Sequence, residues 1–418
     1  MTIENLYALY TQHYKVDTDT RKIRKNSIYF ALKGENFNGN TFAEEALKKG
    51  ANYSIVDEKK YVTNNAIILV DNVLSTLQEL AKYHREHITF PIIGLTGSNG
   101  KTTTKELINC ALSKKFKTTA TKGNLNNHIG VPLTILSFHK ETEFGIVEMG
   151  ANHLKEIEFL CTVAQPDYGY ITNFGKAHLE GFGGVEGVIK GKSELYKYLK
   201  NYHKKAFVNQ NDAKQVVLTQ DMDTIFFSER IRLITSHPFL EVAIDDLSIK
   251  THLTGAYNFS NISCAISVGQ YFGVTHLDIK DAIASYIPAN NRSQMIKTST
   301  NTIILDAYNA NPTSVEAALQ SFRSLNADKK VLILGDMFEL GKEATFEHQK
   351  MADLAIALNF KHIYLVGEHY FKTRTSTYKF KFYADLKNHI TNNPINNATI
   401  LIKGSRGMAL ERLLTIFN

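Results

Sequence analysis

The segment Ile92–Thr104 holds the residue types and the spacing that phosphate binding requires. An apolar stretch runs into a short turn bounded by Gly97 and Gly100, and Lys101 and Thr102 follow directly. Glycines let the backbone curl so that its N–H groups point at phosphate oxygens, and the start of the next helix adds positive potential. A lysine here reaches the β- and γ-phosphates, and a threonine hydroxyl can bind Mg²⁺. The tight Gly-x-x-Gly-Lys-Thr spacing predicts a nucleotide site of the P-loop kind.

Two residues further along the chain are candidate partners for a magnesium ion. Glu148 stands near the end of the apolar stretch Gly145–Met149, where its carboxylate can face a phosphate site. His178 stands in the loop that follows Tyr168–Thr172. By type and spacing alone, Glu148 can equally be a surface residue at a strand end, and His178 is more often an ordinary loop histidine.

These residues need a scaffold, and β-rich stretches alternate with helical periodicity along the whole chain. A helix is expected over Thr103–Phe116, after the phosphate loop, and Val315, Leu319 and Phe322 follow the spacing of one buried helix face. The alternation predicts an α/β protein with mostly parallel sheets covered by helices. The β-rich stretches are Ser27–Leu32, Tyr53–Asp57, Ala66–Val70, Ile92–Thr96, Gly145–Met149, Tyr168–Thr172, Ile303–Asp306, Val331–Gly335, Ile363–Gly367 and Thr399–Lys403.

Two breaks in this pattern suggest three domains. Phe90-Pro91 opens the stretch that carries the phosphate loop, and a new strand–helix series begins near Ser293–Ser299. Because domains usually hold about 100–200 residues, a chain of 418 residues accommodates three. We predict an N-terminal, a central and a C-terminal domain over residues 1–88, 89–296 and 297–418.

Composition excludes several classes of protein. Hydrophobic residues make up 43% and charged residues 21%, which is typical of packed proteins and excludes disorder, collagen and coiled coils. No stretch approaches the roughly 18 consecutive apolar residues of a membrane helix. The N-terminus also lacks the features of a secretory signal. The net charge of +7 comes from scattered lysine pairs, so a solvated surface or a phosphate-rich small substrate accounts for it without nucleic acid.

The three cysteines, Cys110, Cys161 and Cys264, lie far apart and lack the spacing of a metal site. Disulfides are therefore not expected, and small core residues in a reducing compartment fit this pattern. We expect a cytoplasmic protein with no membrane span and no nucleic-acid partner.

Further motifs follow the phosphate loop TGSNGKTTT in a characteristic order: GNLNNHIGVP, EMGAN, NFGKAHLEGFG, KGKSELY, YNFSNISCA, DAYNANPTSVEAAL, LGDMFELG and IKGSRGM. This set resembles the Mur ligase family over nearly the whole chain, from Asp19 to Arg406. Within the family, DAYNANP, LGDMFELG and KGSR resemble the members that join D-alanyl-D-alanine to UDP-N-acetylmuramoyl-tripeptide.

The resemblance implies a three-domain fold and a two-step reaction. An N-terminal domain would hold the UDP end of the substrate, beside a central P-loop ATPase domain with a mostly parallel sheet and a C-terminal Rossmann-like domain. The tripeptide carboxylate would attack the γ-phosphorus of ATP to give an acyl phosphate and ADP, and the dipeptide amine would then displace phosphate. Because a carboxylate is a poor electrophile, this activation supplies the leaving group that amide formation needs.

The resemblance also implies roles for particular residues. Lys101, Glu148, His178 and Lys192 would be catalytic, and Lys192 aligns with a lysine that the family carries as a carbamate. Mg²⁺ would be bound by Thr102, Glu148, His178 and Lys192. ATP would contact Gly97, Ser98, Asn99, Gly100, Lys101, Thr102, Thr103, Asn258, Asn261, Arg292, Asp306 and Tyr308. The UDP substrate and the dipeptide would contact Thr20, Arg21, Asn126, Asn127, Asn309, Asn311, Lys403, Ser405 and Arg406.

Two alternatives stay open at this point. A sister enzyme that adds a single amino acid, including folylpolyglutamate-type ligases, would share the central domain. A non-catalytic P-loop protein would bind nucleotide without the metal partners, although Glu148, His178 and Lys192 are all present. By residue type alone, Lys192 would be an exposed helix lysine. The oligomeric state is expected to be monomeric, and the third residue of the tripeptide is left undetermined.

Overall fold

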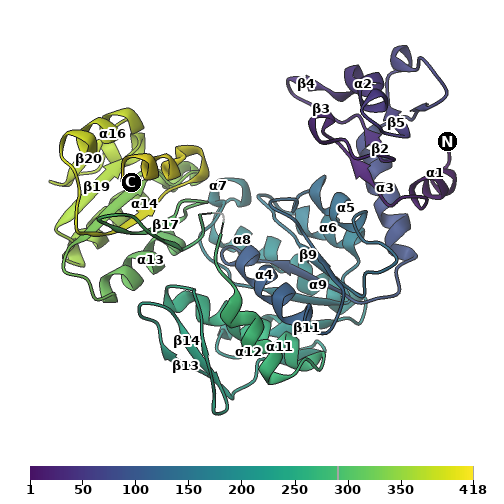
Figure 1. Cartoon of the computed structure of the whole chain (residues 1–418). Coiled ribbons are helices and arrows are strands. Elements are labelled where there is room, and N and C mark those ends of the chain that lie inside the picture. Colours follow the sequence, from purple (N-terminus) through teal and green to yellow (C-terminus); the bar gives the residue numbers. More distant parts are fainter. Residues whose placement is uncertain (290, 418) are drawn as a thin grey trace.

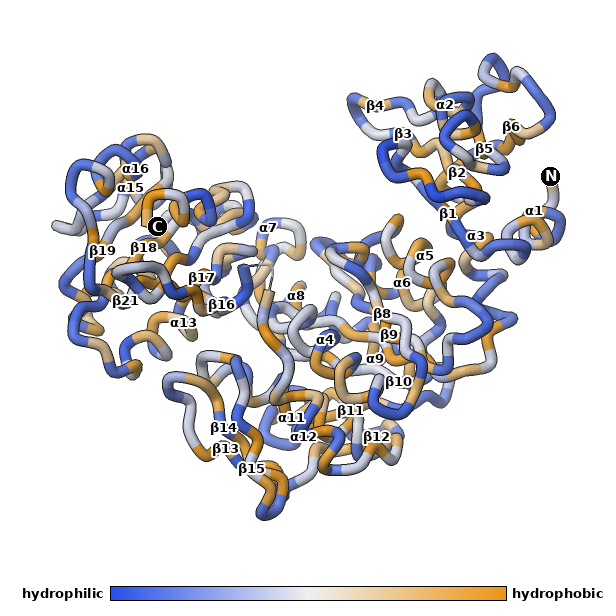
Figure 2. The backbone as a smooth tube through the Cα atoms, viewed as in Figure 1, coloured by the Kyte–Doolittle hydropathy of each residue, from blue (hydrophilic) through white to orange (hydrophobic). Residues whose placement is uncertain are grey.

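Three largely parallel sheets follow one another along the chain in this computed structural model, which describes residues 1–289 and 291–417 (Figure 1). The N-terminal and C-terminal sheets lie on opposite sides of the central one. Hydrophobic residues concentrate on the strands and hydrophilic residues on the connecting loops (Figure 2). The fold is therefore α/β with three domains. The alternation of strands and helices predicts the α/β class, and the two breaks in that pattern predict the three domains.

The N-terminal part has a four-stranded parallel sheet in the order β1-β2-β5-β6. Two of its helices, α1 and α3, also pack toward the central part, since the Tyr10 hydroxyl donates to the Leu136 carbonyl and the Arg85 guanidinium pairs with Asp167. The elements are α1 (Ile3–Tyr10), β1 (Val16–Asp17), β2 (Ile28–Phe30), β3 (Lys33–Gly34), β4 (Phe37–Asn38), α2 (Ala43–Lys48), β5 (Tyr53–Val56), β6 (Ile67–Leu69) and α3 (Val73–Glu86).

The central part has a six-stranded parallel sheet in the order β12-β11-β10-β7-β9-β8. Its strands and helices are β7 (Ile92–Thr96), α4 (Lys101–Leu112), β8 (Thr118–Ala120), α5 (Gly130–Ile135), β9 (Phe144–Glu148), α6 (Glu156–Ala164), β10 (Tyr168–Ile171), α7 (Leu179–Phe182), α8 (Val185–Lys192), α9 (Glu194–Asn201), β11 (Lys205–Val208), α10 (Ala213–Leu218) and β12 (Thr224–Phe226). An antiparallel sheet and two helices follow: β13 (Ile231–Thr235), β14 (Glu241–Ile244), β15 (Leu247–Lys250), α11 (Phe259–Tyr271) and α12 (His276–Ser285).

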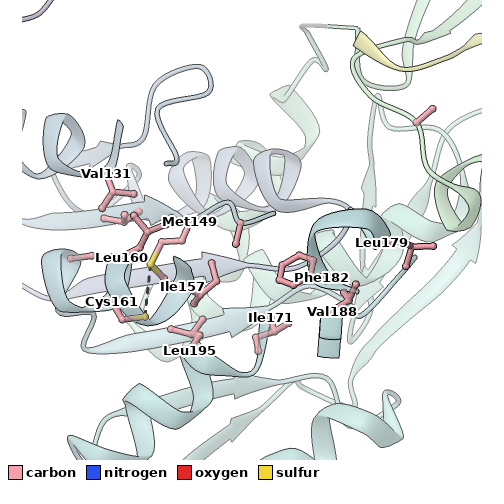
Figure 3. Close-up of a cluster of buried hydrophobic side chains, with 14 of the residues drawn as sticks. Val131, Met149, Ile157, Leu160, Cys161, Ile171, Leu179, Phe182, Val188 and Leu195 are labelled. Carbon is pink, nitrogen blue, oxygen red and sulfur yellow. Dashed lines mark hydrogen bonds between the residues drawn. The ribbon is translucent and has the colours of Figure 1, made fainter. Parts of the chain in front are cut away.

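Helices cover both faces of the central sheet. Every residue of β7 is buried, and Ile92 joins the core beneath α5 and α6 whereas Ile93 and Leu95 join the core beneath α4 and α11. Parallel strands that are buried on both faces read as continuous apolar runs, as this strand does. Figure 3 shows part of the first core, where Cys161 lies against Met149. Cys161 and Cys264 are buried as predicted, whereas Cys110 is partly exposed, and all three are free.

The C-terminal part has a six-stranded sheet in the order β16-β17-β21-β18-β19-β20, in which β16 alone runs antiparallel to its neighbour. The predicted boundary between residues 296 and 297 falls inside β16, so we propose that this domain starts just before Gln294. The elements are β16 (Gln294–Lys297), β17 (Thr302–Asp306), α13 (Pro312–Ser324), β18 (Lys330–Gly335), α14 (Ala344–Ala357), β19 (His362–Val366), α15 (Glu368–Phe371), β20 (Tyr378–Phe380), α16 (Tyr383–Asn392) and β21 (Thr399–Lys403).

The structure departs from the predicted elements in a few places. Helix α4 begins at Lys101 and ends at Leu112, earlier at both ends than Thr103–Phe116. The antiparallel sheet β13–β15 was not predicted from the sequence, because its strands are short and β13 is largely exposed. Over residues 1–289 and 291–417, no helix combines the length and the hydropathy needed to cross a membrane.

His84, where α3 faces both α1 and the central part, is expected to make stability depend on pH. Its ring is 4% exposed and bonds the Phe138 carbonyl and the Tyr7 hydroxyl. Burial lowers the pKa of His84 to about 4. Below its ordinary pKa the unfolded chain binds a proton that the folded chain does not. Stability should therefore fall by about 3 kcal/mol as the pH drops from 6.5 to 4.

Denaturant unfolding at pH 7 and pH 4.5 measures this contribution as a difference between wild type and His84→Gln. The variant should lose less stability than wild type on acidification. His13→Gln, at an exposed position, serves as the control and should behave as wild type. Equal acid sensitivity in all three proteins would refute the role of His84.

Candidate active site

A cavity of about 840 Å³ lies between the central and C-terminal parts. Its walls include the phosphate loop, the end of β9, the loop after β10, the start of α11 and the loop between β17 and α13. The carboxyl ends of parallel strands meet at one edge of a sheet, which is where α/β proteins place their ligands. Most of the predicted site residues line this cavity: Ser98, Asn99, Gly100, Lys101, Thr102, Thr103, Asn126, Asn127, Glu148, His178, Asn258, Asn261, Arg292, Asp306, Tyr308, Asn309, Asn311 and Lys403.

The phosphate loop has the backbone that the sequence predicts. Gly97 has φ 140°, and a Cβ there would lie 2.0 Å from the Thr172 hydroxyl oxygen. Gly100 has φ 81° at the start of α4, and a Cβ there would lie 2.7 Å from the Asn261 side chain. Both positions therefore require glycine, because other residues would meet strain and a clash. The Lys101 ammonium donates to the Gly97 carbonyl at 2.6 Å.

The charges around the loop suit a polyphosphate. Burial lowers the pKa of Lys101, the carboxylate of Glu148 opposes this shift, and the cation of Arg292 adds to it. Lys101 and Arg292 both line the cavity, and α4 begins at Lys101, so its N-terminus faces the same space. Such an arrangement neutralises transferring phosphoryl groups.

Glu148 fits a magnesium ligand. Its side chain is 2% exposed, one carboxylate oxygen accepts from the Asn126 amide at 2.9 Å, and the other oxygen is buried with no hydrogen-bond partner. The Thr102 hydroxyl belongs to the same cavity. Hard oxygen donors of this kind are what Mg²⁺ prefers. Within the described residues, no group of three or more His, Cys, Asp or Glu suits a metal, so the substrate phosphates would complete the shell.

Replacement of Glu148 by glutamine should raise the Mg²⁺ concentration for half-maximal turnover by at least about tenfold, since an uncharged amide replaces a direct ligand. A magnesium titration at saturating ATP measures the effect. Glu141→Gln, on the exposed loop before β9, is the matched control and should leave the titration unchanged. An unaltered magnesium requirement in Glu148→Gln would remove Glu148 from the metal site.

Lys192 is fully buried rather than an exposed helix lysine. Its ammonium donates to the Ala151 carbonyl at 2.9 Å and lies 5.0 Å from the ring centre of Phe182. Burial lowers the pKa of Lys192 well below its ordinary value, and the charge of Lys101 lowers it further. A lowered pKa raises the neutral fraction of the amine, and the neutral amine is the form that adds CO₂ to give a carbamate. Lys192 lies behind the cavity wall and does not line the cavity itself.

His178 lies in the cavity wall next to the C-terminal part. Its Nδ1 is 2.5 Å from a carboxylate oxygen of Glu339, and its backbone has φ 53°. Both His178 and Glu339 (φ 61°) adopt the left-handed conformation that costs a non-glycine residue free energy. Their juxtaposition holds the imidazole at the junction of the two parts.

The adenine and ribose side of the predicted site is built from three elements. Asn261 donates to Asn258, which in turn donates to the Thr254 carbonyl, so the two amides form one buried network. The Arg292 guanidinium lies 3.5 Å from the ring centre of Tyr308. Asp306 pairs with Lys403 at 2.6 Å, which leaves the ammonium of Lys403 engaged inside the protein.

The residues predicted for the dipeptide share the C-terminal wall. Asn311 caps α13 and donates from its amide to the Asn99 side chain at 2.7 Å, linking this wall to the phosphate loop. Ser405 is buried and accepts from the Phe338 amide, and Arg406 lies 5.3 Å from the ring centre of Tyr308. Ser405, Arg406 and Gly97 are not among the residues that line the cavity.

Thr20 and Arg21 lie apart from this cavity, in a short helical turn of the N-terminal part. The Arg21 side chain is exposed and paired with Asp19 at 2.8 Å. Other lining residues were not predicted, among them Asn173, Thr313, Tyr257, Lys155 and Ser293. Asn173 and Thr313 sit inside the motifs NFGK and NPTS, so proximity to those motifs was the available signal.

Comparison with known proteins shows which family has this arrangement of three domains. Three family profiles match in order: "Mur ligase family, catalytic domain" over residues 13–91, "Mur ligase middle domain" over 95–269, and "Mur ligase, glutamate ligase domain" over 291–406. A UDP-N-acetylmuramoyl-tripeptide--D-alanyl-D-alanine ligase of Bacillus subtilis is 34% identical over 99% of this chain and 95% of that protein. The chain belongs to the Mur ligase family.

Solved Mur ligase structures have the same overall arrangement. MurF of Acinetobacter baumannii superposes with a TM-score of 0.85 at 30% identity, covering 100% of this chain and 98% of that one. The MurF ligase of Thermotoga maritima, solved in complex with ADP, gives 0.84 at 26% identity, covering 98% and 97%. Mur ligases form amide bonds using ATP, and this chain is an enzyme of that kind.

Proposed function

We propose that this Mur ligase joins D-alanyl-D-alanine to UDP-N-acetylmuramoyl-tripeptide, with ATP and Mg²⁺, in peptidoglycan precursor synthesis. One observation carries the proposal: a single cavity holds the phosphate loop on one wall and the Asn309–Asn311 loop on the other. The B. subtilis relative named for this reaction covers almost the whole chain, which supports the same substrates here. Sister ligases that add one amino acid share the fold at much lower identity.

The first step activates the tripeptide carboxylate. Its oxygen attacks the γ-phosphorus of ATP, the bond to the β-phosphate bridging oxygen breaks, and ADP leaves. Lys101 and the backbone amides of the phosphate loop hold the phosphates for this in-line transfer. Thr102, Glu148 and His178 would hold Mg²⁺, which neutralises phosphate charge when bound, and Lys192 as a carbamate would support it. Asn126 and Asn127 would orient the substrate next to Glu148.

The second step forms the amide bond. The dipeptide amine attacks the activated carbonyl, and phosphate leaves with the oxygen that came from the carboxylate. Asn309 and Asn311 offer amide groups to a small zwitterion, and Arg406 adds a positive charge close by. Enclosure between two domains would keep water from the acyl phosphate. Thr20 and Arg21 would contact the UDP end, and Asn258, Asn261, Arg292, Asp306 and Tyr308 the nucleoside of ATP.

The cysteines bear on where this chemistry takes place. Cys110, Cys161 and Cys264 are all free, which suits a reducing compartment. We extend the proposal to a monomeric enzyme of the cytoplasm.

Phosphate release tests the proposal. Purified protein receives ATP, Mg²⁺ and UDP-N-acetylmuramoyl-tripeptide, with and without D-alanyl-D-alanine, and the product mass is recorded. The proposal requires phosphate release that needs both substrates and yields the pentapeptide nucleotide. Turnover with a single amino acid instead would identify a sister ligase. No turnover with any amine would favour a nucleotide-binding protein without catalysis.

A further inference from the structure

The loop 173–180 follows β10, ends with the first two residues of α7, and lies at the junction of the central and C-terminal parts (Figure 1). On one side it bonds the phosphate loop, and on the other it bonds the C-terminal domain. A change in its contacts with the C-terminal domain would therefore alter the position of the phosphate loop.

The contacts with the phosphate loop are direct. The Ser98 amide donates to the Asn173 carbonyl at 3.0 Å, and the Ser98 hydroxyl donates to the Gly175 carbonyl at 2.8 Å. The Asn99 amide donates to the Asn173 side chain at 3.1 Å, and that side chain donates back to the Asn99 carbonyl at 3.0 Å. Displacement of Asn173 would therefore disturb two of the three residues between Gly97 and Lys101.

The contacts with the C-terminal domain centre on Lys176. Its backbone amide donates to the Thr313 hydroxyl at 2.9 Å, and its ammonium pairs with Glu347 of α14 at 2.5 Å. Close by, the Glu180 amide donates to the Glu339 carbonyl at 3.2 Å. Lys176 is thus held by both α13 and α14, two residues before His178.

The pair between Lys176 and Glu347 differs from a surface ion pair because Glu347 is buried. Its side chain is 2% exposed, Lys176 is its one side-chain partner among the described residues, and its second carboxylate oxygen has no partner. Exposed pairs contribute little because water and salt screen them. A buried carboxylate that loses its cation is strongly unfavourable, so closure of this junction depends on the lysine charge.

We propose that Lys176 and Glu347 are positioning residues, whose ion pair, buried at Glu347 and partly exposed at Lys176, sets the loop 173–180 against the phosphate loop when the C-terminal domain docks. Neither residue lines the cavity. The pair fixes the position of Asn173, which bonds Ser98 and Asn99. It also fixes the position of His178, which lies two residues after Lys176 in the chain. The consequence for turnover rests on the proposed ligase function, whereas the consequence for loop order does not.

Two measurements on Lys176→Met, Lys176→Arg and Glu347→Gln test this inference. Hydrogen exchange of the ligand-free protein should be faster in Lys176→Met over residues 97–100 and 173–180. In steady-state assays, kcat should fall about tenfold, with KM for the UDP substrate nearly unchanged. Lys176→Arg keeps the charge and should stay within about threefold of wild type. Glu347→Gln removes the buried charge and should partly restore activity to Lys176→Met in the double variant.

The matched control is Lys350→Met, on the same helix α14, whose pair with Glu316 is exposed at 3.8 Å. It should change neither exchange nor turnover. Wild-type exchange over residues 97–100 in Lys176→Met, or an undiminished kcat, would overturn the inference. If Lys176→Met fails to fold, the same exchange and kinetic measurements on Glu347→Gln, compared with wild type, test the inference. Inactive wild type would refute the proposed function, while the exchange data would still decide the role of the pair.

Discussion

Replacement of Lys101 by alanine is expected to lower ATP-dependent turnover by about a thousandfold, at the upper end of the loss seen when one transition-state donor is removed. The ammonium already lies within the phosphate loop, 2.6 Å from the Gly97 carbonyl. As charge develops on the transferring phosphoryl group, no other side chain of the loop can replace this cation. Steady-state kinetics with both substrates measure the loss, which should fall mainly on kcat/KM for ATP.

Lys114→Ala is the control for this experiment, because Lys114 is exposed just beyond the end of α4. It should match wild type, and unfolding curves should agree for all three proteins. Ligation by Lys101→Ala at the wild-type rate would contradict the assignment of the phosphate site.

Replacement of Lys192 by alanine is expected to reduce kcat by about a hundredfold or more, a loss comparable to that of a group beside the metal. The side chain is completely buried, and its lowered pKa raises the fraction of neutral amine, the form that takes up CO₂. The carbamate would place a negative charge near the Lys101 ammonium, whose charge already lowers the pKa of Lys192. Added acetate should restore part of the lost rate by supplying a carboxylate at the same place.

Intact mass and ¹³C NMR with labelled bicarbonate detect the modification directly. Wild type should carry one carbamate, and Lys192→Ala should carry none. Lys190→Ala, at an exposed position two residues earlier in α8, should keep both the modification and the activity. An unmodified wild type with full activity would refute the carbamate, whereas full activity in Lys192→Ala would refute any role for the residue.

Local sequence was sufficient to predict the phosphate loop. Gly97 and Gly100 occupy backbone conformations that their neighbours force, so the motif and the geometry correspond residue by residue. Seven strands of the two six-stranded sheets also follow from their apolar runs, because burial on two faces leaves a strong signal in the sequence. These strands are β7, β9, β10, β17, β18, β19 and β21. The antiparallel strands β13–β15 carry no such signal.

Contacts between distant segments could not be predicted in this way. Lys192 reads as a surface lysine from its own type, and only the surrounding motif points to another role. The pairs Asp306–Lys403 and Lys176–Glu347 join residues 97 and 171 positions apart. Such pairs depend on how whole sheets are placed relative to each other, and a short stretch of sequence does not determine that placement.

The central claim is that this site activates a carboxylate as an acyl phosphate. It is tested most directly by preparing UDP-N-acetylmuramoyl-tripeptide with ¹⁸O in its terminal carboxylate and analysing the phosphate released during ligation. The account predicts one ¹⁸O atom in each phosphate, because the carboxylate oxygen leaves with it. Phosphate free of ¹⁸O, with ligation intact, would contradict the account.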